Sequence, residues 1–231
     1  MKKLAFIVGL VLFGCEGWNM GGPDNPPDPY PLVVGNSWHY IAISGDITDW
    51  FIDSVAAKEP FGSHQNAYRI VEITSGKGAA FWLPERMRTR DIFEWHAFYD
   101  DDYLVFALAD PYDTMEIRLF KRDPDIGDRW ASYREITVYD EDGDMIEDTL
   151  IFSLMMEIVS YEDVMTPAGE FASFRSLRSE WDSLWLSGTG EWEVNTYYWD
   201  YFFWAPGVGM IKYCDYWDEN QGYHLESYNL R

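Results

Sequence analysis

The strongest constraint on the fold is a run of aromatic residues near the C-terminus. Seven of the eight residues from Tyr197 to Trp204 carry aromatic rings, in the order YYWDYFFW. Neighbouring residues of a strand point to opposite faces of a sheet, so a flat sheet with one face in water would expose about half of these rings. Both faces of this strand therefore have to be covered, either by curling the sheet into a half-barrel or by packing a second sheet against it.

The same alternation predicts which rings of this run lie together. Odd-numbered positions share one face of the strand and even-numbered positions share the other. Because Asp200 interrupts the even-numbered face, we expect that face to reach solvent near its middle and the odd-numbered face to be better buried. The rings that we expect either to line a concave ligand-binding face or to fill the core, the more ordinary role, are those of Trp199, Tyr201, Phe203 and Trp204.

Most of the remaining chain also has the pattern of strands. Short runs rich in β-branched and aromatic residues are separated by turns with Gly, Asp or Pro, and residues 57–66 read as a loop. Residues 84–97 mix helix formers with large apolar residues, so we expect strands there with one short helix. Two runs alternate cleanly, with one apolar face made by Met115, Ile117 and Leu119 and another by Leu150, Phe152, Leu154, Met156 and Ile158.

These patterns predict a mainly β fold built as a single curved antiparallel sheet or half-barrel, with a two-sheet β-sandwich as the alternative. A short motif occurs twice: residues 34–38 and 126–130 both read apolar-Gly-Asn/Asp-x-Trp, each before a predicted strand. The Gly suits a turn, and the Trp would plug the end of the sheet. Two copies do not define a repeat architecture.

The N-terminus has the charge, length and order of a secretory signal peptide. Lys2 and Lys3 precede an apolar run over residues 4–13, which is shorter than the about 20 residues of a membrane-spanning helix. The run ends in Leu-Phe-Gly-Cys at residues 12–15, which resembles the lipobox of bacterial lipoproteins, although Phe13 replaces a residue that is usually small. This resemblance implies cleavage before Cys15, lipid attachment at Cys15, and anchoring in the bacterial cell envelope, at its periplasmic face or at the cell surface.

The segment after Cys15 reads as a spacer. Residues 16–31 contain five Pro and three Gly residues, which disfavour helices and central strands. We therefore divide the chain into a lipoprotein signal peptide over residues 1–14, a lipidated N-terminus and Pro/Gly-rich tether over residues 15–31, and a single β domain over residues 32–231.

The net charge limits the classes of partner. Seventeen basic and forty acidic residues give a formal charge of −23, which repels phosphate backbones and excludes nucleic acid as an expected partner. The acidic residues are spread along the chain, so they read as a solvated coat, with a cation-steering surface as the alternative. The expected partner is the membrane, through the N-terminal lipid, with a lipid or a glycan as the ligand class.

No motif predicts a catalytic residue, a metal site or a cofactor. Cys214 has no second cysteine to pair with once Cys15 is lipidated, and it reads as a structural thiol. The acidic run Asp140–Asp144 lacks the later Gly and Glu positions of a calcium loop and is typical of a hairpin turn. The four histidines, which have no metal-ligand spacing, are His39, His64, His96 and His224.

Four short stretches resemble a broad set of uncharacterised exported bacterial lipoproteins. They are GNSW at residues 35–38, TPAGEF at 166–171, APGVGMIK at 205–212 and LESYNL at 225–230. The resemblance implies a curved antiparallel sheet, similar to the half-barrels of periplasmic lipoprotein carriers, and it supplies no catalytic residues. We thus expect a non-enzymatic envelope protein that binds an apolar or amphipathic ligand in its curved sheet. The alternatives are a carbohydrate-binding or adhesion module, marked by exposed coplanar rings, and, less favoured, a hydrolase with paired carboxylates.

Overall fold

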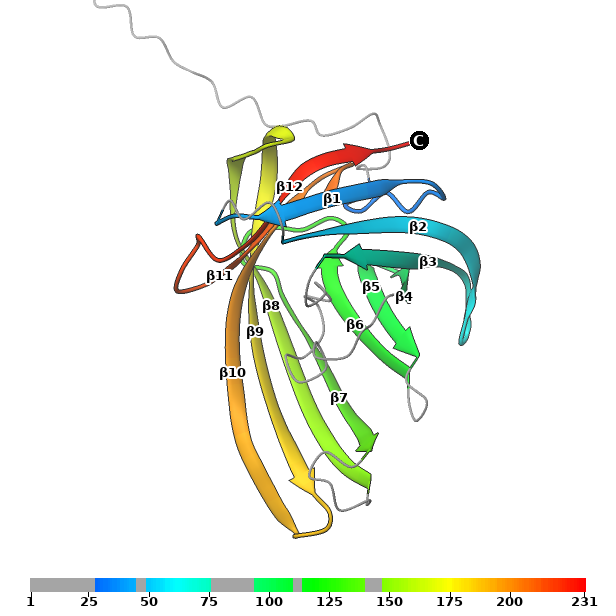
Figure 1. The fold of residues 1–231 in the computed structure, drawn as a ribbon, viewed down its shortest axis with the longest axis vertical. Coiled ribbons are helices and arrows are strands. Elements are labelled where there is room, and N and C mark those ends of the chain that lie inside the picture. Colours follow the sequence, from blue (N-terminus) through cyan, green and yellow to red (C-terminus); the bar gives the residue numbers. More distant parts are fainter. Residues whose placement is uncertain (1–27, 45–48, 76–93, 110–113, 140–146) are drawn as a thin grey trace, which may run out of the picture.

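One antiparallel sheet of twelve strands makes up the computed structural model (Figure 1), which describes residues 28–44, 49–75, 94–109, 114–139 and 147–231. No helix within these ranges is long and apolar enough to cross a membrane. The strands are β1 (Ser37–Ala42), β2 (Trp50–Phe61), β3 (His64–Thr74), β4 (Glu94–Asp100), β5 (Tyr103–Ala109), β6 (Thr114–Lys121), β7 (Arg129–Tyr139), β8 (Glu147–Thr166), β9 (Gly169–Leu186), β10 (Glu191–Ala205), β11 (Gly209–Asp215) and β12 (Gly222–Asn229).

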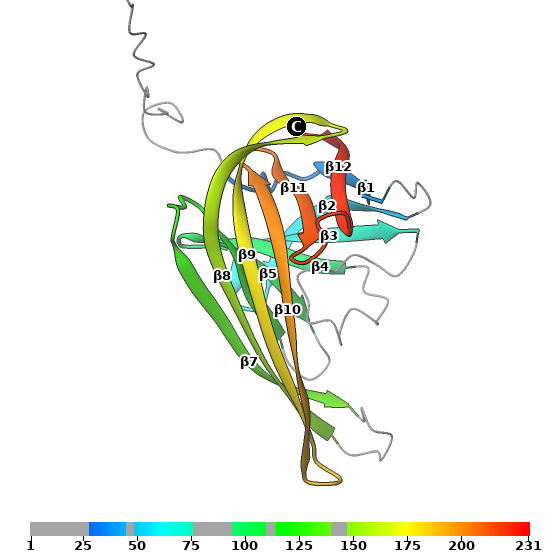
Figure 2. The ribbon, with the colours of Figure 1, turned by 90° about the vertical axis from the view of Figure 1, so that its left-hand side faces the viewer.

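The sheet curls until its two edge strands meet. Its order is β6-β5-β4-β3-β2-β1-β12-β11-β10-β9-β8-β7, so the first and last strands pair in the middle while β6 and β7 form the edges. The edges are joined by side chains: Trp130 Nε1 donates to the Arg118 carbonyl at 2.9 Å, and the Arg118 amide donates to Ser132 Oγ at 3.1 Å. The predicted single curved sheet is confirmed, and the two-sheet sandwich does not form. Strand β7 and the long strands β8, β9 and β10 extend beyond the rest of the sheet as an arm (Figure 2).

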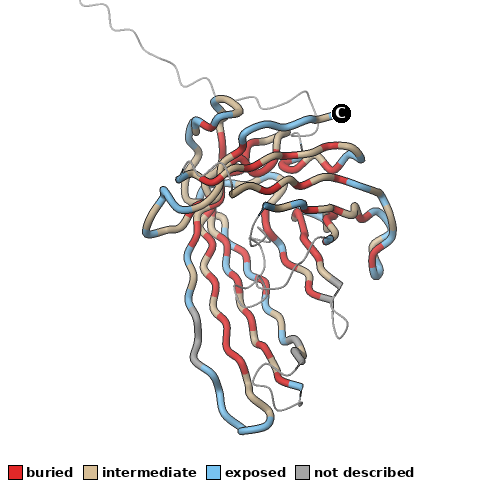
Figure 3. The backbone as a smooth tube through the Cα atoms, viewed as in Figure 1, coloured by how far each residue is buried: buried red, intermediate tan, exposed pale blue. Residues whose placement is uncertain are grey.

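The concave side of the sheet is filled by its own side chains. Both predicted apolar faces, on β6 and on β8, are at most 1% exposed, and buried residues alternate with less buried ones along the long strands (Figure 3). Large rings fill the centre. Trp95 of β4 lies 4.1 Å from Phe106 of the neighbouring β5, and Phe120 of β6 lies 5.0 Å from Trp204 of the distant β10, measured between ring centroids. Such rings bury large apolar areas and dominate a core.

The prediction of a loop over residues 57–66 is wrong. Strand β2 continues to Phe61 and β3 begins at His64, so the two strands are joined by a tight turn in which Gly62 has a φ of 53°. The stretch is polar because this end of the hairpin is largely exposed, and the regular alternation is lost because the register shifts twice; both features resemble a loop in the sequence.

Residues 76–93 lie outside the described residues. So does the acidic turn Asp140–Asp144, but Tyr139 pairs with Glu147 on either side of it, as a hairpin requires.

The first copy of the repeated motif forms a corner that leads into β1. Gly35 has a φ of 95°, and its amide donates to the Val55 carbonyl at 2.9 Å. The Val55 amide donates back to the Asn36 carbonyl, also at 2.9 Å. Trp38 then points into the core, where its Nε1 donates to the carbonyl of Val208.

The second copy repeats this geometry at the start of β7. Gly127 has a φ of 94°, its amide donates to the Ile158 carbonyl at 2.8 Å, and the Ile158 amide donates to the Asp128 carbonyl at 3.0 Å. Trp130 is buried as Trp38 is. The sequence motif therefore marks two equivalent corners, each of which opens a run of six strands.

The packed part of the chain begins before Leu32. Tyr30, which the sequence placed in the spacer, is 2% exposed and stacks on Trp38 with ring centroids 4.2 Å apart. The Tyr99 hydroxyl accepts from the Tyr30 amide at 3.0 Å and donates to the Tyr30 carbonyl at 2.8 Å. A Cβ at Gly209 would lie 2.7 Å from the Tyr30 ring, so this Gly allows the ring to enter. The signal peptide, Cys15 and the tether up to residue 27 lie outside the described residues.

We expect replacement of Tyr30→Ala to lower the free energy of unfolding by about 3–5 kcal/mol, because a ring buried between Trp38 and Gly209 is lost. Tyr30→Phe is the matched control, since the Tyr30 hydroxyl has no hydrogen-bond partner within the described ranges, and it should cost less than about 1 kcal/mol. Urea unfolding of the three proteins, with Cys15→Ser in each, measures both values. Equal stability of all three would contradict the burial of this ring.

Candidate functional site

The four aromatic residues singled out from the sequence do not lie together. Trp204 is fully buried on the concave side, where it contacts Phe120. Trp199, Tyr201 and Phe203 lie on the outer side, with exposures that range from 39% for Trp199 to 3% for Phe203. Trp204 is therefore core, whereas the outer rings form a different surface.

The expected burial of the two faces of β10 is wrong, because the even-numbered face is the better buried one. Phe202 and Trp204 are fully buried and Asp200 is 6% exposed, whereas Tyr197 is 67% exposed. Asp200 faces inward because Arg178 of β9, itself fully buried, lies 3.8 Å from its carboxylate. Arg178 also pairs with the buried carboxylate of Glu180. Buried charges are tolerated when they are paired in this way, so an acidic residue did not mark the solvent side.

Phe203 is buried on the outer face by two long cationic side chains. The Arg175 guanidinium and the Lys212 ammonium lie 5.4 Å and 5.1 Å from the centre of its ring. Glu219 holds both, at 2.6 Å from Arg175 and 3.8 Å from Lys212. Cationic side chains can cover apolar surface with their stems while the charged ends stay in water. Phe203 is thus part of the packed structure.

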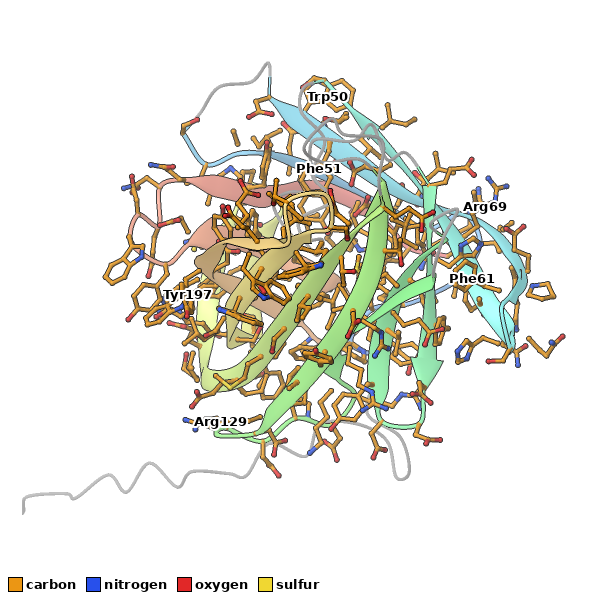
Figure 4. The ribbon with its side chains drawn as sticks, turned by 90° about the horizontal axis from the view of Figure 1, so that it is seen from below. Trp50, Phe51, Phe61, Arg69, Arg129 and Tyr197 are labelled. Atoms are coloured by element: carbon orange, nitrogen blue, oxygen red, sulfur yellow. The ribbon has the colours of Figure 1, made fainter. Side chains whose placement is uncertain are left out.

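The remaining outer rings continue into the loop between β11 and β12. Trp199 and Trp217 lie 6.0 Å apart with ring planes 14° from parallel, and Tyr216 packs against the edge of both. Trp217 is 80% exposed, and Tyr197 lies at the periphery of the molecule (Figure 4). We call Tyr197, Trp199, Tyr201, Tyr216 and Trp217 the outer aromatic surface. Exposed apolar groups gathered in this way are typical of binding surfaces.

The loop that carries Tyr216 and Trp217 is held by hydrogen bonds. The Asp215 carboxylate accepts from the amides of Trp217 at 2.7 Å and Asp218 at 2.9 Å. The Tyr216 amide donates to the Trp199 carbonyl at 3.0 Å, which fixes the loop against β10. The backbone amide of Asn220 and the side chain of Gln221 donate to the Asp218 carboxylate, and these bonds lower its pKa. The rings are therefore positioned before any ligand arrives, which reduces the entropic cost of binding.

Polar groups border the outer aromatic surface. The Arg175 guanidinium stacks on the Tyr201 ring at 3.6 Å and binds the exposed Glu219 carboxylate. Burial raises the pKa of Tyr201 further above neutral pH. Exposed ring faces beside a guanidinium, a carboxylate and a hydroxyl can contact the apolar face of a ligand and bind its polar edge at once.

One pair of interior carboxylates bears on the hydrolase alternative. Asp53 of β2 and Glu72 of β3 are direct partners across the two strands, and they are 1% and 2% exposed. Burial, and then the charge of Glu72, raise the pKa of Asp53 well above its usual value. Almost none of either side chain reaches the surface. The pair therefore belongs to the packed interior, and the hydrolase alternative gains no cleft from it.

Cys214 and the histidines have structural surroundings. Cys214 is fully buried, and burial raises the pKa of its thiol to about 11, which makes it an inert thiol rather than a nucleophile. Within the described ranges, no group of three or more His, Cys, Asp or Glu side chains could hold a metal ion. The four histidines lie in four different strands: His39 in β1, His64 in β3, His96 in β4 and His224 in β12.

The sequence reasoning missed the loop half of the outer aromatic surface. Tyr216 and Trp217 stand among Asp, Asn and Gly residues that favour turns, in the order DYWDENQG. Two large rings inside such a polar turn cannot be placed by strand alternation. Large rings in a predicted turn do indicate exposed aromatic surface, because loops lie at the surface of a protein.

We expect Phe203→Ala and Trp199→Ala to differ in stability. Phe203 is buried under Arg175 and Lys212, so its truncation should cost about 3–5 kcal/mol, whereas the half-exposed Trp199 should cost about 1 kcal/mol. Thermal and urea unfolding of both variants measure the difference. A Trp199→Ala variant that is as unstable as Phe203→Ala would show that Trp199 is part of the core.

Comparisons with known proteins give two structural neighbours. No protein-family model matches the chain, and no curated protein matches it. A candidate lipoprotein from Parabacteroides distasonis ATCC 8503 is 17% identical with a TM-score of 0.49, over 88% of this chain and 99% of that one. A candidate exported protein with a YmcC-like fold, from Bacteroides fragilis NCTC 9343, is 13% identical with a TM-score of 0.44, over 88% of this chain and 100% of that one. The chain is thus similar to two crystal structures of bacterial proteins, at low sequence identity.

Proposed function

We propose that this chain is a non-enzymatic, lipid-anchored protein of the bacterial cell envelope that binds carbohydrate on its outer aromatic surface. The observation that carries the proposal is the pair of nearly parallel indole rings of Trp199 and Trp217, which are 39% and 80% exposed. Exposed aromatic rings on the outer side of the sheet favour a carbohydrate-binding or adhesion module over a carrier with a deep cavity.

The chemistry of the outer aromatic surface suits a sugar. The C–H face of a pyranose ring is apolar and stacks on indole and phenol rings, while its hydroxyl groups both donate and accept hydrogen bonds. Arg175 supplies donors and Glu219 supplies acceptors beside the rings. The net charge of −23 opposes the approach of acidic polymers, which favours a neutral glycan.

The function expected from the sequence, binding of an apolar or amphipathic ligand in the concave face, has less support. The concave side is occupied by the protein's own rings, among them Trp38, Trp95 and Trp204, each at most 1% exposed. A ligand would have to displace rings that already contact each other at about 4–5 Å. The outer aromatic surface needs no such displacement.

Anchoring is supported by the sequence at the N-terminus. The basic start, the apolar run and the Leu-Phe-Gly-Cys ending at Cys15 are typical of a lipoprotein signal. The Pro-rich spacer that follows would hold the β domain away from the membrane. A surface that binds glycans would then be held within reach of other envelope components.

We expect the Cys15→Ser variant to move from the membrane fraction to the soluble fraction when the chain is expressed in a Gram-negative host, because attached acyl chains provide the anchor. Fractionation with immunoblotting, and mass spectrometry of the N-terminus, measure the change. Ser37→Ala serves as the matched control and should stay in the membrane. An unmodified Cys15 in the mature protein would refute the anchor without affecting glycan binding.

We expect Trp217→Ala to weaken binding to neutral oligosaccharides by about tenfold, equivalent to about 1.4 kcal/mol, because the most exposed ring of the outer aromatic surface is lost. A glycan array first selects the ligand for the Cys15→Ser protein, and calorimetry then compares the variants. Tyr133→Ala, which removes a 55% exposed ring on β7, is the matched control. Equal affinity of all three proteins, or no glycan bound at all, would refute the proposed function.

A further inference from the structure

A second feature with the form of a binding site lies on the outer side of β1, β2 and β12. It is a groove with a volume of about 310 Å³, at the lower end of the size range of small-molecule sites. Its walls combine one aromatic ring and two aliphatic side chains with one imidazole and one carboxylate. The lining residues are His39, Ile41, Trp50, Ile52 and Glu226.

An irregularity in the sheet brings the two polar groups together. On β12, Ser227 pairs with His39 and Leu225 pairs with Tyr40, so Glu226 is an extra residue without a partner on β1. Such bulges redirect side chains and are common beside functional sites. Here the bulge lets Glu226 Oε2 approach His39 Nδ1 to 2.8 Å. Because Nδ1 is occupied, Nε2 is the ring atom that remains for a ligand.

The aromatic wall of the groove is fixed through its backbone. The Trp50 amide donates to Ser75 Oγ at 2.9 Å, and the Trp50 carbonyl accepts from the Ser75 amide at 3.0 Å. The Thr74 hydroxyl donates to the same carbonyl at 3.3 Å. The indole ring meets the His39 ring at 84°, with 5.7 Å between centroids. The groove is therefore assembled in advance, as a binding site of moderate affinity requires.

We propose that this groove binds the terminal pyranose of a neutral glycan, as a second site separate from the outer aromatic surface. The ligand class rests on the proposed function, but the site does not depend on Trp199 or Trp217. Trp50 and Tyr197 lie at separate places on the periphery of the molecule (Figure 4). Two separate sites on one chain allow a single glycan chain, or two neighbouring chains, to be held more tightly than either site could alone.

The composition of the groove argues for a neutral, hydroxylated ring. Trp50, Ile41 and Ile52 offer apolar contact to a C–H face, while His39 and Glu226 offer one nitrogen and one carboxylate oxygen to adjacent hydroxyl groups. A cationic ligand would have to compete with His39 for the Glu226 carboxylate. An anionic ligand would meet the carboxylate and the net charge of −23.

The test counts binding sites. The Cys15→Ser protein is titrated by calorimetry with the neutral oligosaccharide selected on the array, and with free glucose, galactose and mannose. Trp50→Ala and Glu226→Gln should each weaken monosaccharide binding by about tenfold and leave one site for the oligosaccharide. Trp217→Ala, as the matched control, should keep the monosaccharide site. Unfolding curves of all variants report whether each remains folded. If Trp50→Ala does not fold, the conservative Glu226→Gln variant still tests the groove.

The outcomes separate this inference from the proposed function. A single site that Trp217→Ala abolishes and neither groove variant changes would overturn the groove and leave the proposed function intact. Absence of any glycan binding would overturn both. Saturable binding of a cationic probe such as choline that Trp50→Ala removes, without monosaccharide binding, would overturn the ligand class proposed for the groove.

Discussion

A single sheet has no second layer to cover its apolar face, and every other feature of this structure follows from that constraint. The sheet has to curl around its own side chains until little space is left inside. Large aromatic side chains fill this interior efficiently, because each spans much of the distance between opposite strands. Trp38, Trp95 and Trp204 come from three separated strands and are each at most 1% exposed. The high aromatic content of the chain is in this sense a requirement of the architecture.

The curled sheet consists of two runs of six strands that start in the same way. The corner at Gly35 and the corner at Gly127 share their positive φ, their backbone hydrogen bonds and the buried Trp that follows. The runs are joined differently at their two meeting lines. Strands β1 and β12 pair along the whole length of β1, whereas β6 and β7 are connected through Ser132 and Trp130. One junction is continuous sheet, and the other is a seam held by side chains.

Sequence patterns predicted the fold well where burial follows local alternation. The inward faces of β6 and β8 could be read directly because apolar and polar residues alternate there. The pattern failed on β10, because Asp200 is paired with Arg178 on the neighbouring strand, and no local signal reports a partner 22 residues away. The sequence prediction also failed at Tyr30. The surrounding prolines indicated a spacer, but the Tyr30 ring packs into the core. The candidate site was half predictable, since Trp199 belongs to a strand and Trp217 to a turn whose course depends on Asp215.

The position of Tyr30 also determines how the molecule responds to tension. The chain reaches the sheet at β1, which lies in the middle of the strand order, and Tyr30 is the first buried ring of the part that the structure describes. The ring of Tyr30 stacks on Trp38 of β1 and lies against Gly209 of β11, and its backbone amide and carbonyl are hydrogen-bonded to the Tyr99 hydroxyl of β4. A pull from the N-terminal side is therefore shared among three strands at once. If the chain is anchored by its N-terminus, a pull on the segment before Tyr30 would load these three strands together before it reached the hydrogen bonds of any one of them.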